Sequence, residues 1–295
     1  MSKMVKALLD GQASATVINS RDIVNEAVRL HGLSPVAAAA LGRTLTMASI
    51  MGSGLKGKTD RLTITISGGG ELGRITVCSD SEGCVKGYVG NPDCPTYSNE
   101  KGKLDVGRAV GREGTLTVIK DLGLKNPFNA STQLVSGEIA EDFAMYFLKS
   151  EQTRSAVALG VLEDTDGKCL NAAGIFVFLL PGCSDKVIGK LECYLGEMAE
   201  VSGMVPEDDP AEFLKGFFDL FDVEIIEERE VFYRCDCSEE RISAALKSLG
   251  RKECMETLDK EGKIEVVCRF CNKKYVFDRE KTESLFSERL TGNEE

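Results

Sequence analysis

The chain has 295 residues, of which 42% are hydrophobic and 28% charged. This is ordinary globular usage, so it excludes a fully disordered chain, and the length suggests two domains or one domain with an appendage. Acidic side chains outnumber basic ones by 47 to 36, which gives a formal net charge of −11. Such a surface repels nucleic-acid backbones and anionic lipid, so neither is an expected partner. The single histidine, His31, disfavours histidine metal centres and histidine-dependent catalytic triads.

The N-terminal residues show no sign of a signal peptide, because MSKMVKALLD lacks an apolar core and a small-residue cleavage site. The longest apolar stretch, residues 36–55, is interrupted by Arg43 and reads as alanine-rich and amphipathic, too mixed to span a membrane. We therefore expect a soluble cytoplasmic protein. Eleven cysteines in a reducing compartment indicate metal binding or redox chemistry and not a permanent disulfide framework.

Residues 1–183 are predicted to form an α+β domain of antiparallel sheets with packed helices. Short β-like runs occur at residues 62–66, 74–78, 84–89, 115–119, 155–162 and 174–180. Glycine-rich turns separate the first three, as in an antiparallel meander. The last run is apolar on both faces, which favours a central strand. The strands and helices do not alternate regularly, and this is typical of the α+β class.

Helix boundaries in this domain have local signals. Ser34, as a capping hydroxyl, and Pro35 at the first helical position predict the start of an alanine-rich helix. Gly32 suits the C-terminal end of the preceding helix, which we expect to begin near Asp22. Apolar residues close to helical spacing predict a third helix over residues 139–149.

Residues 184–230 carry nearly the whole net charge of the chain, with 14 acidic and 4 basic side chains, a net charge of −10. Two apolar stripes nevertheless predict two amphipathic helices. The first stripe comprises Val187, Ile188, Leu191, Leu195 and Met198, and the second comprises Phe213, Phe217 and Phe221. The segment is therefore predicted to be an acidic helical linker and not a solvated tail.

The second linker helix has clear start signals, with Asp209 as the cap, Pro210 at the first position and Glu212 completing a capping box. Interior glycines oppose both helices at about 1 kcal/mol each relative to alanine. They are Gly189, Gly196 and Gly216. We expect both helices to need a neighbour to stay folded. The alternative is an ordinary helical hairpin packed on the first domain.

Residues 231–295 form a unit too small to be stabilised by its hydrophobic core alone. Units of this size usually depend on a bound metal ion or on disulfides. It contains two cysteine pairs, Cys235-Asp-Cys237 and Cys268-Arg-Phe-Cys271, separated by 30 residues. Each pair lets one turn of backbone present two thiolates, and two pairs complete the tetrahedral sulfur cage that zinc prefers. Zn²⁺ is the usual occupant of an isolated sulfur site, although iron–sulfur or copper(I) binding is chemically possible.

The same four sulfurs allow redox chemistry. Cys-x-x-Cys is the spacing of readily formed disulfides, and a Cys-x-Cys bridge is possible but strained. Oxidation to two local disulfides would expel a bound metal; the alternative is an inert structural zinc site. The other cysteines lack metal-ligand spacing, so we expect most of them to be buried as small apolar residues. They are Cys78, Cys84, Cys94, Cys169, Cys183, Cys193 and Cys254, the last a candidate to intercept an oxidation intermediate.

Two other classes of protein could use these cysteines. A zinc-ribbon module that binds nucleic acid or protein would have the same cage, but residues 238–267 hold 7 acids and 6 bases and offer no basic face. A thiol–disulfide oxidoreductase could use Cys268 and Cys271, but it would need an exposed cysteine of low pKa at a helix start after a strand.

Beyond the cysteines, several longer motifs are diagnostic. They are GRTLT at residue 42, TITISGGG at 63, GKLDV at 102, KDLGLK at 120, VSGEIAED at 135 and SEQ at 150. Together with Cys-x-Cys and Cys-x-x-Cys at this separation, they closely resemble the redox-regulated 33 kDa chaperonin family of bacteria, which are heat-shock holdases. The resemblance covers essentially the whole chain.

The resemblance implies a stress-response chaperone that is not an enzyme and has no catalytic residues. In the reduced, inactive state Cys235, Cys237, Cys268 and Cys271 would hold one Zn²⁺. Oxidation would join Cys235 to Cys237 and Cys268 to Cys271 and release the metal. The zinc domain (231–295) and the linker (184–230) would then unfold and bind unfolding client proteins without ATP, often as a homodimer. Candidate client-binding residues are Phe213, Phe217, Phe218 and Phe221.

Overall fold

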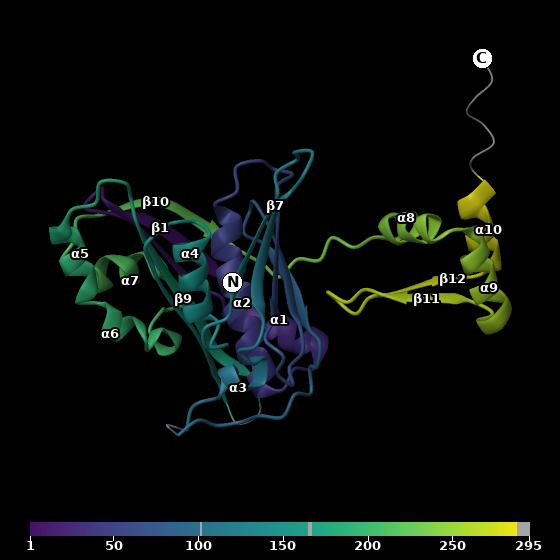
Figure 1. The fold of residues 1–295 in the computed structure, drawn as a ribbon, viewed down its shortest axis with the longest axis horizontal. Helices are drawn as coiled ribbons and strands as arrows, with labels where there is room; N and C mark the ends of the chain where they lie inside the picture. Colours follow the sequence, from purple (N-terminus) through teal and green to yellow (C-terminus); the bar gives the residue numbers. More distant parts are fainter. Residues whose placement is uncertain (101, 165–166, 288–295) are drawn as a thin grey trace, which may run out of the picture. The chain divides into compact units, whose positions relative to one another are not determined.

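The computed structural model describes residues 1–100, 102–164 and 167–287. These residues form two compact units, one from Met1 to Arg234 and one from Cys235 onward (Figure 1). Both are mixed in secondary structure, and the first contains the antiparallel sheets expected of an α+β domain. Within the described ranges, no helix combines the length and apolar character needed to cross a membrane.

The first unit contains an antiparallel five-stranded sheet, which we name sheet A, with strand order β10-β1-β2-β9-β8. Its strands are β1 (Lys3–Leu9), β2 (Ala13–Asn19), β8 (Ser155–Glu163), β9 (Cys169–Leu179) and β10 (Val223–Glu230). The interior position of β9 confirms the central strand expected near residues 174–180. The local sequence signals did not predict β1 or β2, and β10 lies in the segment predicted to be helical.

A second antiparallel sheet, sheet B, has strand order β5-β4-β3-β6-β7. Its strands are β3 (Arg61–Ser67), β4 (Ile75–Asp80), β5 (Val85–Val89), β6 (Thr115–Asp121) and β7 (Phe128–Gln133). Strands β3 to β5 are the predicted meander, with pairs such as Ile64 opposite Val77. The β3–β4 turn needs glycine, because a Cβ on Gly70 would come within 2.2 Å of the Ala109 carbonyl oxygen.

Helix α2 (Pro35–Ser53) packs against strands of both sheets, so nearly every residue along it is buried. The prediction that this stretch is amphipathic is therefore wrong: a helix that contacts protein on all sides is apolar all round. Its start at Pro35 is confirmed, but the Ser34 hydroxyl donates to the Cys94 carbonyl, at 2.7 Å, and does not cap the helix. The charged side chain of Arg43, which belongs to this buried helix, forms an ion pair with Glu138 at 2.7 Å.

Two further helices of the first domain, α1 (Arg21–His31) and α4 (Ala140–Lys149), agree with their sequence signals, whereas the short helix α3 (Val106–Val110) was not predicted. Gly32 ends α1 with a φ of 60°, the left-handed conformation in which glycine carries no Cβ penalty.

The linker segment lies on sheet A. It forms α5 (Asp185–Glu192), α6 (Leu195–Met198), the 3₁₀ turn Val201–Gly203, α7 (Pro210–Phe217) and then β10. These helices pack with alternate residues of β2, such as Ala15 and Val17, whereas Ile18 of the same strand packs with α2. Because alternate residues of a strand point to opposite faces, the linker helices and α2 cover opposite faces of sheet A.

Four details of the linker differ from the sequence predictions or refine them. The first apolar stripe is divided between α5 and α6, and α7 ends at Phe217, so Phe221 lies beyond the helix. The last eight residues pair with β1 as strand β10, from Lys3 opposite Glu230 to Leu9 opposite Val223. The Asp209 cap is confirmed, since its carboxylate accepts from the Glu212 N–H at 2.9 Å.

The second unit consists of α8 (Glu239–Leu249), α9 (Arg251–Glu261), the antiparallel hairpin β11 (Ile264–Val267) and β12 (Lys274–Phe277), and α10 (Arg279–Ser287). Its buried hydrophobic residues are Leu246, Cys254, Leu258, Ile264, Cys268, Tyr275 and Phe277. Burying a side chain of this kind contributes about 1.5–3 kcal/mol, so a core this small needs a further source of stability.

Candidate metal centre and the linker that precedes it

Four cysteine sulfurs converge in the second unit. Cys235 and Cys237 lie before α8, and Cys268 and Cys271 lie in the turn between β11 and β12. The Sγ atoms of Cys235 and Cys268 are 3.7 Å apart, those of Cys237 and Cys271 are 3.4 Å apart, and all four lie within 4.8 Å of one another. Tetrahedral Zn²⁺ with bonds of about 2.3 Å separates its sulfurs by about 3.8 Å. The four donors therefore fit one zinc ion.

Local backbone geometry aims the second pair of sulfurs inward. The Asn272 N–H donates to the Cys268 carbonyl at 2.8 Å, and the Cys268 N–H donates to the Lys273 carbonyl at 3.0 Å. Asn272 adopts a φ of 57°, a left-handed conformation that asparagine tolerates better than most residues. This tight turn lets Cys268 and Cys271 face the same point.

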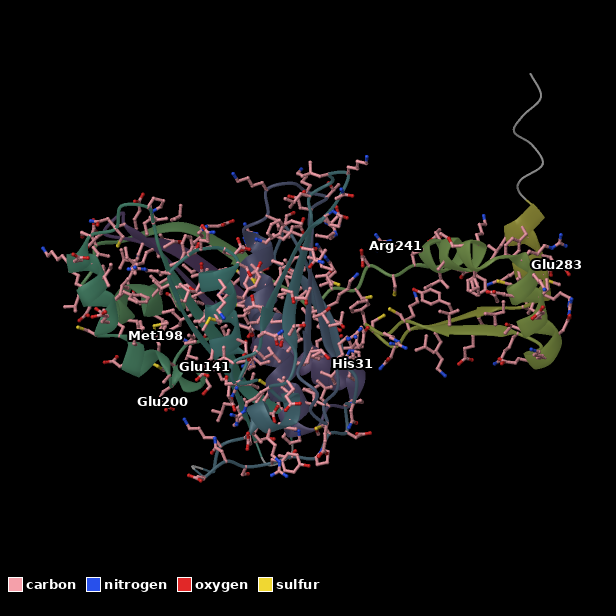
Figure 2. All side chains as sticks on the ribbon, in the orientation of Figure 1. His31, Glu141, Met198, Glu200, Arg241 and Glu283 are labelled. Atoms are coloured by element: carbon pink, nitrogen blue, oxygen red, sulfur yellow. The ribbon has the colours of Figure 1, made fainter. Side chains whose placement is uncertain are left out.

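The first pair is fixed to the beginning of α8. Arg241, labelled in Figure 2, forms an ion pair with Asp236, the residue between the two cysteines. The Ser238 hydroxyl accepts from the Arg241 N–H at 3.3 Å and caps the helix. The cap and the ion pair together hold Cys235 and Cys237 against one helix end.

The thiols of the cluster differ in their tendency to ionise. Burial raises the pKa of the Cys235 and Cys271 thiols. Burial also acts to raise the pKa of Cys237, but hydrogen bonds from Tyr275 and the neighbouring cysteines outweigh it and bring the pKa to about 7. Cys237 thus ionises more readily than Cys235 and Cys271, and thiolates are the forms that bind zinc and react with oxidants.

Four of the seven cysteines outside the cluster are buried, in line with the prediction that most of them would be. Cys84, Cys94, Cys169 and Cys254 are buried, Cys78 and Cys183 are partly buried, and Cys193 is exposed. Burial raises the pKa of Cys169 to about 12. Cys254 is 1% exposed and donates to the Leu246 carbonyl at 3.6 Å, so it is a packed core residue in this state.

The linker phenylalanines form an aromatic cluster on sheet A, centred on Tyr194. Phe218 and Phe221 are 0% and 8% exposed, whereas Phe213 and Phe217 are partly buried. The Tyr194 ring centroid lies 5.2 Å from that of Phe218 and 5.4 Å from that of Phe217. Tyr194, which lies outside both predicted stripes, also donates its hydroxyl to Asp219 at 2.9 Å. In the folded linker, these aromatic side chains are therefore engaged with the sheet and one another.

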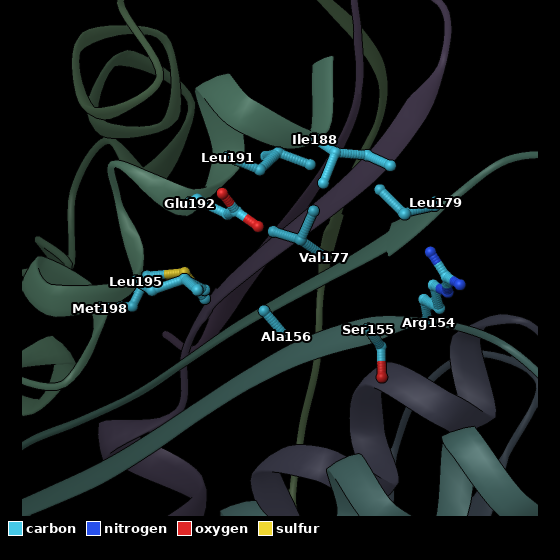
Figure 3. Close-up of a pocket in the computed structure, with 10 residues that line it drawn as sticks. All are labelled: Arg154, Ser155, Ala156, Val177, Leu179, Ile188, Leu191, Glu192, Leu195 and Met198. Carbon is cyan, nitrogen blue, oxygen red and sulfur yellow. The ribbon is translucent and has the colours of Figure 1, made fainter. Parts of the chain in front are cut away.

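Linker and sheet leave a gap between them. A pocket of about 260 Å³ separates α5 and α6 from β8 and β9, with Ile188 and Leu191 facing Val177 across it (Figure 3). The remaining lining residues are Arg154, Ser155, Ala156, Leu179, Glu192, Leu195 and Met198. Apolar side chains on the two sides of this surface pocket do not fill it, so α5 and α6 contact the sheet less extensively here than a fully packed interface would allow.

Residues 231–234, which we name the strap, bind the edge of sheet B directly before the first zinc-site cysteine. The Val85 N–H donates to the Phe232 carbonyl at 2.9 Å, and the Arg234 N–H donates to the Val85 carbonyl at 2.8 Å. The Tyr233 hydroxyl donates to the Gly87 carbonyl at 2.8 Å and accepts from the Gly87 N–H at 3.2 Å. The strap therefore satisfies polar groups of an edge strand.

A second group of potential metal ligands lies next to the strap. Asp80, Glu82 and Cys84 have ligand atoms within 4.8 Å of one another. The Arg234 guanidinium, however, pairs with Asp80 at 2.7 Å and with Glu82 at 2.6 Å. The acidic group thus already has a cationic partner, and that partner adjoins Cys235.

Comparison with known proteins assigns the family. Residues 2–278 match the family model described as "Hsp33 protein". A "33 kDa chaperonin" of Alkaliphilus metalliredigens is 45% identical over 97% of this chain and 99% of its own length, and one of Bacillus subtilis is 43% identical over 97% and 98%. The crystal structure of the 33 kDa chaperonin of Thermotoga maritima superposes with a TM-score of 0.85 at 38% identity, covering 96% of this chain and 97% of that one. The chain belongs to the Hsp33 family of 33 kDa chaperonins.

Proposed function

We propose that this chain is a redox-regulated chaperone that binds unfolding proteins without ATP and acts in the cytoplasm as a holdase and not as an enzyme. One observation supports the proposal above the others: four thiols converge at zinc-ligand separation in a small unit that follows, after the strap, an acidic linker with a surface pocket beneath it. The three functional segments are residues 1–183, 184–230 and 231–295.

In the reduced state, Cys235, Cys237, Cys268 and Cys271 would hold one Zn²⁺. Such a metal, when bound, supplies folding free energy, about 10–16 kcal/mol in zinc-finger peptides at pH 7. Once the conformational entropy lost on folding is subtracted, a core with seven buried residues in the described part of the unit leaves little net stability, so the metal term would decide whether this unit folds. The reduced unit therefore stays folded, and the linker and strap stay on the first domain.

Oxidation removes the ligands. We propose disulfides between Cys235 and Cys237 and between Cys268 and Cys271, as the family resemblance implies. Each disulfide forms as two thiolates give two electrons to a peroxide, whose O–O bond breaks and which leaves as two waters after taking up two protons. A disulfide sulfur no longer carries the thiolate charge that zinc requires, so the metal leaves and the unit loses its staple.

Loss of the second unit weakens the linker, because Arg234 of the strap is joined directly to Cys235. The linker then exposes Phe213, Phe217, Phe218 and Phe221 as an apolar surface for client segments, and the oxidised chain forms a homodimer. The charge of −10 over residues 184–230 keeps such a complex soluble. No nucleic acid or membrane takes part.

The geometry gives less support to a thiol–disulfide oxidoreductase. That chemistry needs an accessible nucleophilic cysteine at a helix start. In the Cys-x-x-Cys pair that such an enzyme would use, Cys268 is only 9% exposed, and both cysteines lie in the turn between β11 and β12 and not at a helix start. The test of the chaperone function is light scattering from an unfolding client, with suppression expected only from oxidised protein.

Two glycines give a way to strengthen the linker. Gly189 in α5 and Gly216 in α7 have no positive φ, and a Cβ added to either would meet no atom within 4 Å. We expect Gly189→Ala and Gly216→Ala to stabilise the linker by about 1 kcal/mol each, because alanine loses less backbone entropy in a helix. Limited proteolysis after oxidation measures this effect. The linker of each variant should be cleaved more slowly, and a higher temperature should be needed to release it from sheet A.

The control is Gly54→Ala in the first domain, where a Cβ would meet only the Met51 carbonyl oxygen, at 3.4 Å. This substitution does not alter the linker, so the protease should cleave the linker of this variant at the wild-type rate. Faster cleavage of the double linker variant would contradict the assignment of these glycines as sources of metastability.

A further inference from the structure

Tyr275 contacts the metal centre without being one of its ligands. It lies on β12 opposite Val266 of β11 and is 5% exposed. Its hydroxyl donates to the Sγ of Cys237 at 3.1 Å. The buried ring packs in the same small cluster as Phe277 and Ile264, so the hydroxyl has little freedom to turn away from the sulfur.

The sulfurs of the cluster accept hydrogen bonds from different kinds of donor. The backbone N–H of Cys237 donates to Cys235, and that of Lys273 donates to Cys271. Cys237 accepts from a side-chain hydroxyl instead. A side-chain donor can be removed by substitution without altering the chain's backbone, so its contribution can be measured separately.

A hydrogen bond to a ligand sulfur has two consequences. It fixes the direction in which the sulfur faces the metal, and outer contacts of this kind typically change metal affinity by about 10–100-fold. In the zinc-bound form, where each ligand sulfur would already be a thiolate, it also occupies a lone pair and stabilises the negative charge, which makes the sulfur a weaker nucleophile toward an oxidant.

We propose that Tyr275 is a positioning residue of the metal centre, which orients the Cys237 thiolate and slows its attack on oxidants. The inference rests on the proposed four-thiolate site. In the step that it slows, the Cys237 sulfur attacks a peroxide oxygen, an S–O bond forms, the O–O bond breaks and hydroxide leaves. The resulting sulfenic acid then reacts with the Cys235 thiolate, forming the S–S bond and releasing a second hydroxide.

The experiment compares full-length wild-type protein with Tyr275→Phe, which retains the ring and removes only the hydroxyl. The matched control is Thr282→Val. Thr282 is a buried residue of the same unit, 0% exposed, whose hydroxyl donates to the Asp278 carbonyl at 2.8 Å. Replacing this hydroxyl by a methyl group removes the hydrogen bond at the start of α10, which does not involve any of the four sulfurs.

Three readouts are made on reduced protein. In the Co²⁺-loaded form, Tyr275→Phe is expected to shift the sulfur-to-cobalt charge-transfer band to longer wavelength, because the thiolate becomes more electron-rich. In competition with a chromophoric chelator, the apparent zinc affinity is expected to fall about 10-fold or more. Peroxide is expected to release zinc several times faster than from the wild type, and Thr282→Val to leave the cobalt band in place.

The outcomes separate the two hypotheses. An unshifted cobalt band and an unchanged rate of zinc release in Tyr275→Phe would overturn the role of Tyr275 while leaving the cage intact. Equal shifts in Thr282→Val would also overturn it, because the effect would then follow from stability. A wild-type protein with no thiolate-to-cobalt band would overturn the cage itself and Tyr275's role with it.

Discussion

Cys268→Ser is expected to lower zinc affinity by several orders of magnitude and to unfold the second unit under reducing conditions. Cys268 is 9% exposed and its Sγ lies 3.7 Å from that of Cys235. Serine has nearly the same size, but its neutral hydroxyl is a poor substitute for a thiolate ligand. Because the free energy of metal binding is also folding free energy in such units, losing the metal removes about 10 kcal/mol or more of support.

Chelator competition measures the affinity of this variant, and amide hydrogen exchange reports folding of residues after Cys235. Part of the linker should also become protease-sensitive without oxidant. The matched control is Cys254→Ser, a buried cysteine of the same unit that lies outside the cluster. It should lose some packing yet keep its zinc. Wild-type zinc affinity in Cys268→Ser would show that the four sulfurs do not form one cage.

Leu214→Ala is expected to release the linker without oxidation. Leu214 lies on α7 and is 0% exposed, packed in the cluster that joins the linker to sheet A. Removing a buried leucine side chain costs about 2–5 kcal/mol, depending on how far the site can collapse. The linker is proposed to be marginally stable, so a loss of this size is expected to be enough to release it.

Limited proteolysis of reduced, zinc-loaded protein measures the effect as rapid cleavage within residues 184–230. Leu220→Ala provides the control, because the same substitution there removes a side chain that is 51% exposed. It should be cleaved like the wild type. A Leu214→Ala protein that resists cleavage as well as this control would contradict the view that burial on sheet A holds the linker in place.

Features of the fold that depend on local chemistry were predictable from the sequence. Gly32 and Asp209 mark helix ends through their own conformational and hydrogen-bonding properties, and both predictions are confirmed. The meander of β3 to β5 follows from short alternating runs joined by glycine turns. Each of these signals acts within a few residues of the chain.

Features that depend on distant partners were not predictable. Strand β10 is stabilised by pairing with β1, whose residues lie more than 200 positions earlier. Its sequence, VEIIEERE, is mostly charged, so no local signal distinguished it from the acidic helices before it. Phe221 follows helical spacing from Phe217, yet the helix ends first and the ring packs on Tyr194 instead.

The same distinction holds for the candidate site. Cys235, Cys237, Cys268 and Cys271 stand out by spacing alone, and the structure brings their sulfurs together. Tyr275 gains its relation to the site only through the β11–β12 hairpin, and Arg234 only through its ion pairs with the β4–β5 turn. Neither contact can be recognised from the spacing of residues along the sequence.

The central claim is that oxidation of the four-thiol centre activates client binding. Its most direct test is light scattering from a heat-unfolding client at mildly raised temperature, comparing zinc-loaded reduced protein with peroxide-treated protein. We predict strong scattering with the reduced protein and suppression only with the oxidised protein. Equal suppression by both would mean a constitutive chaperone with a structural zinc site, and no suppression by either would contradict the holdase function.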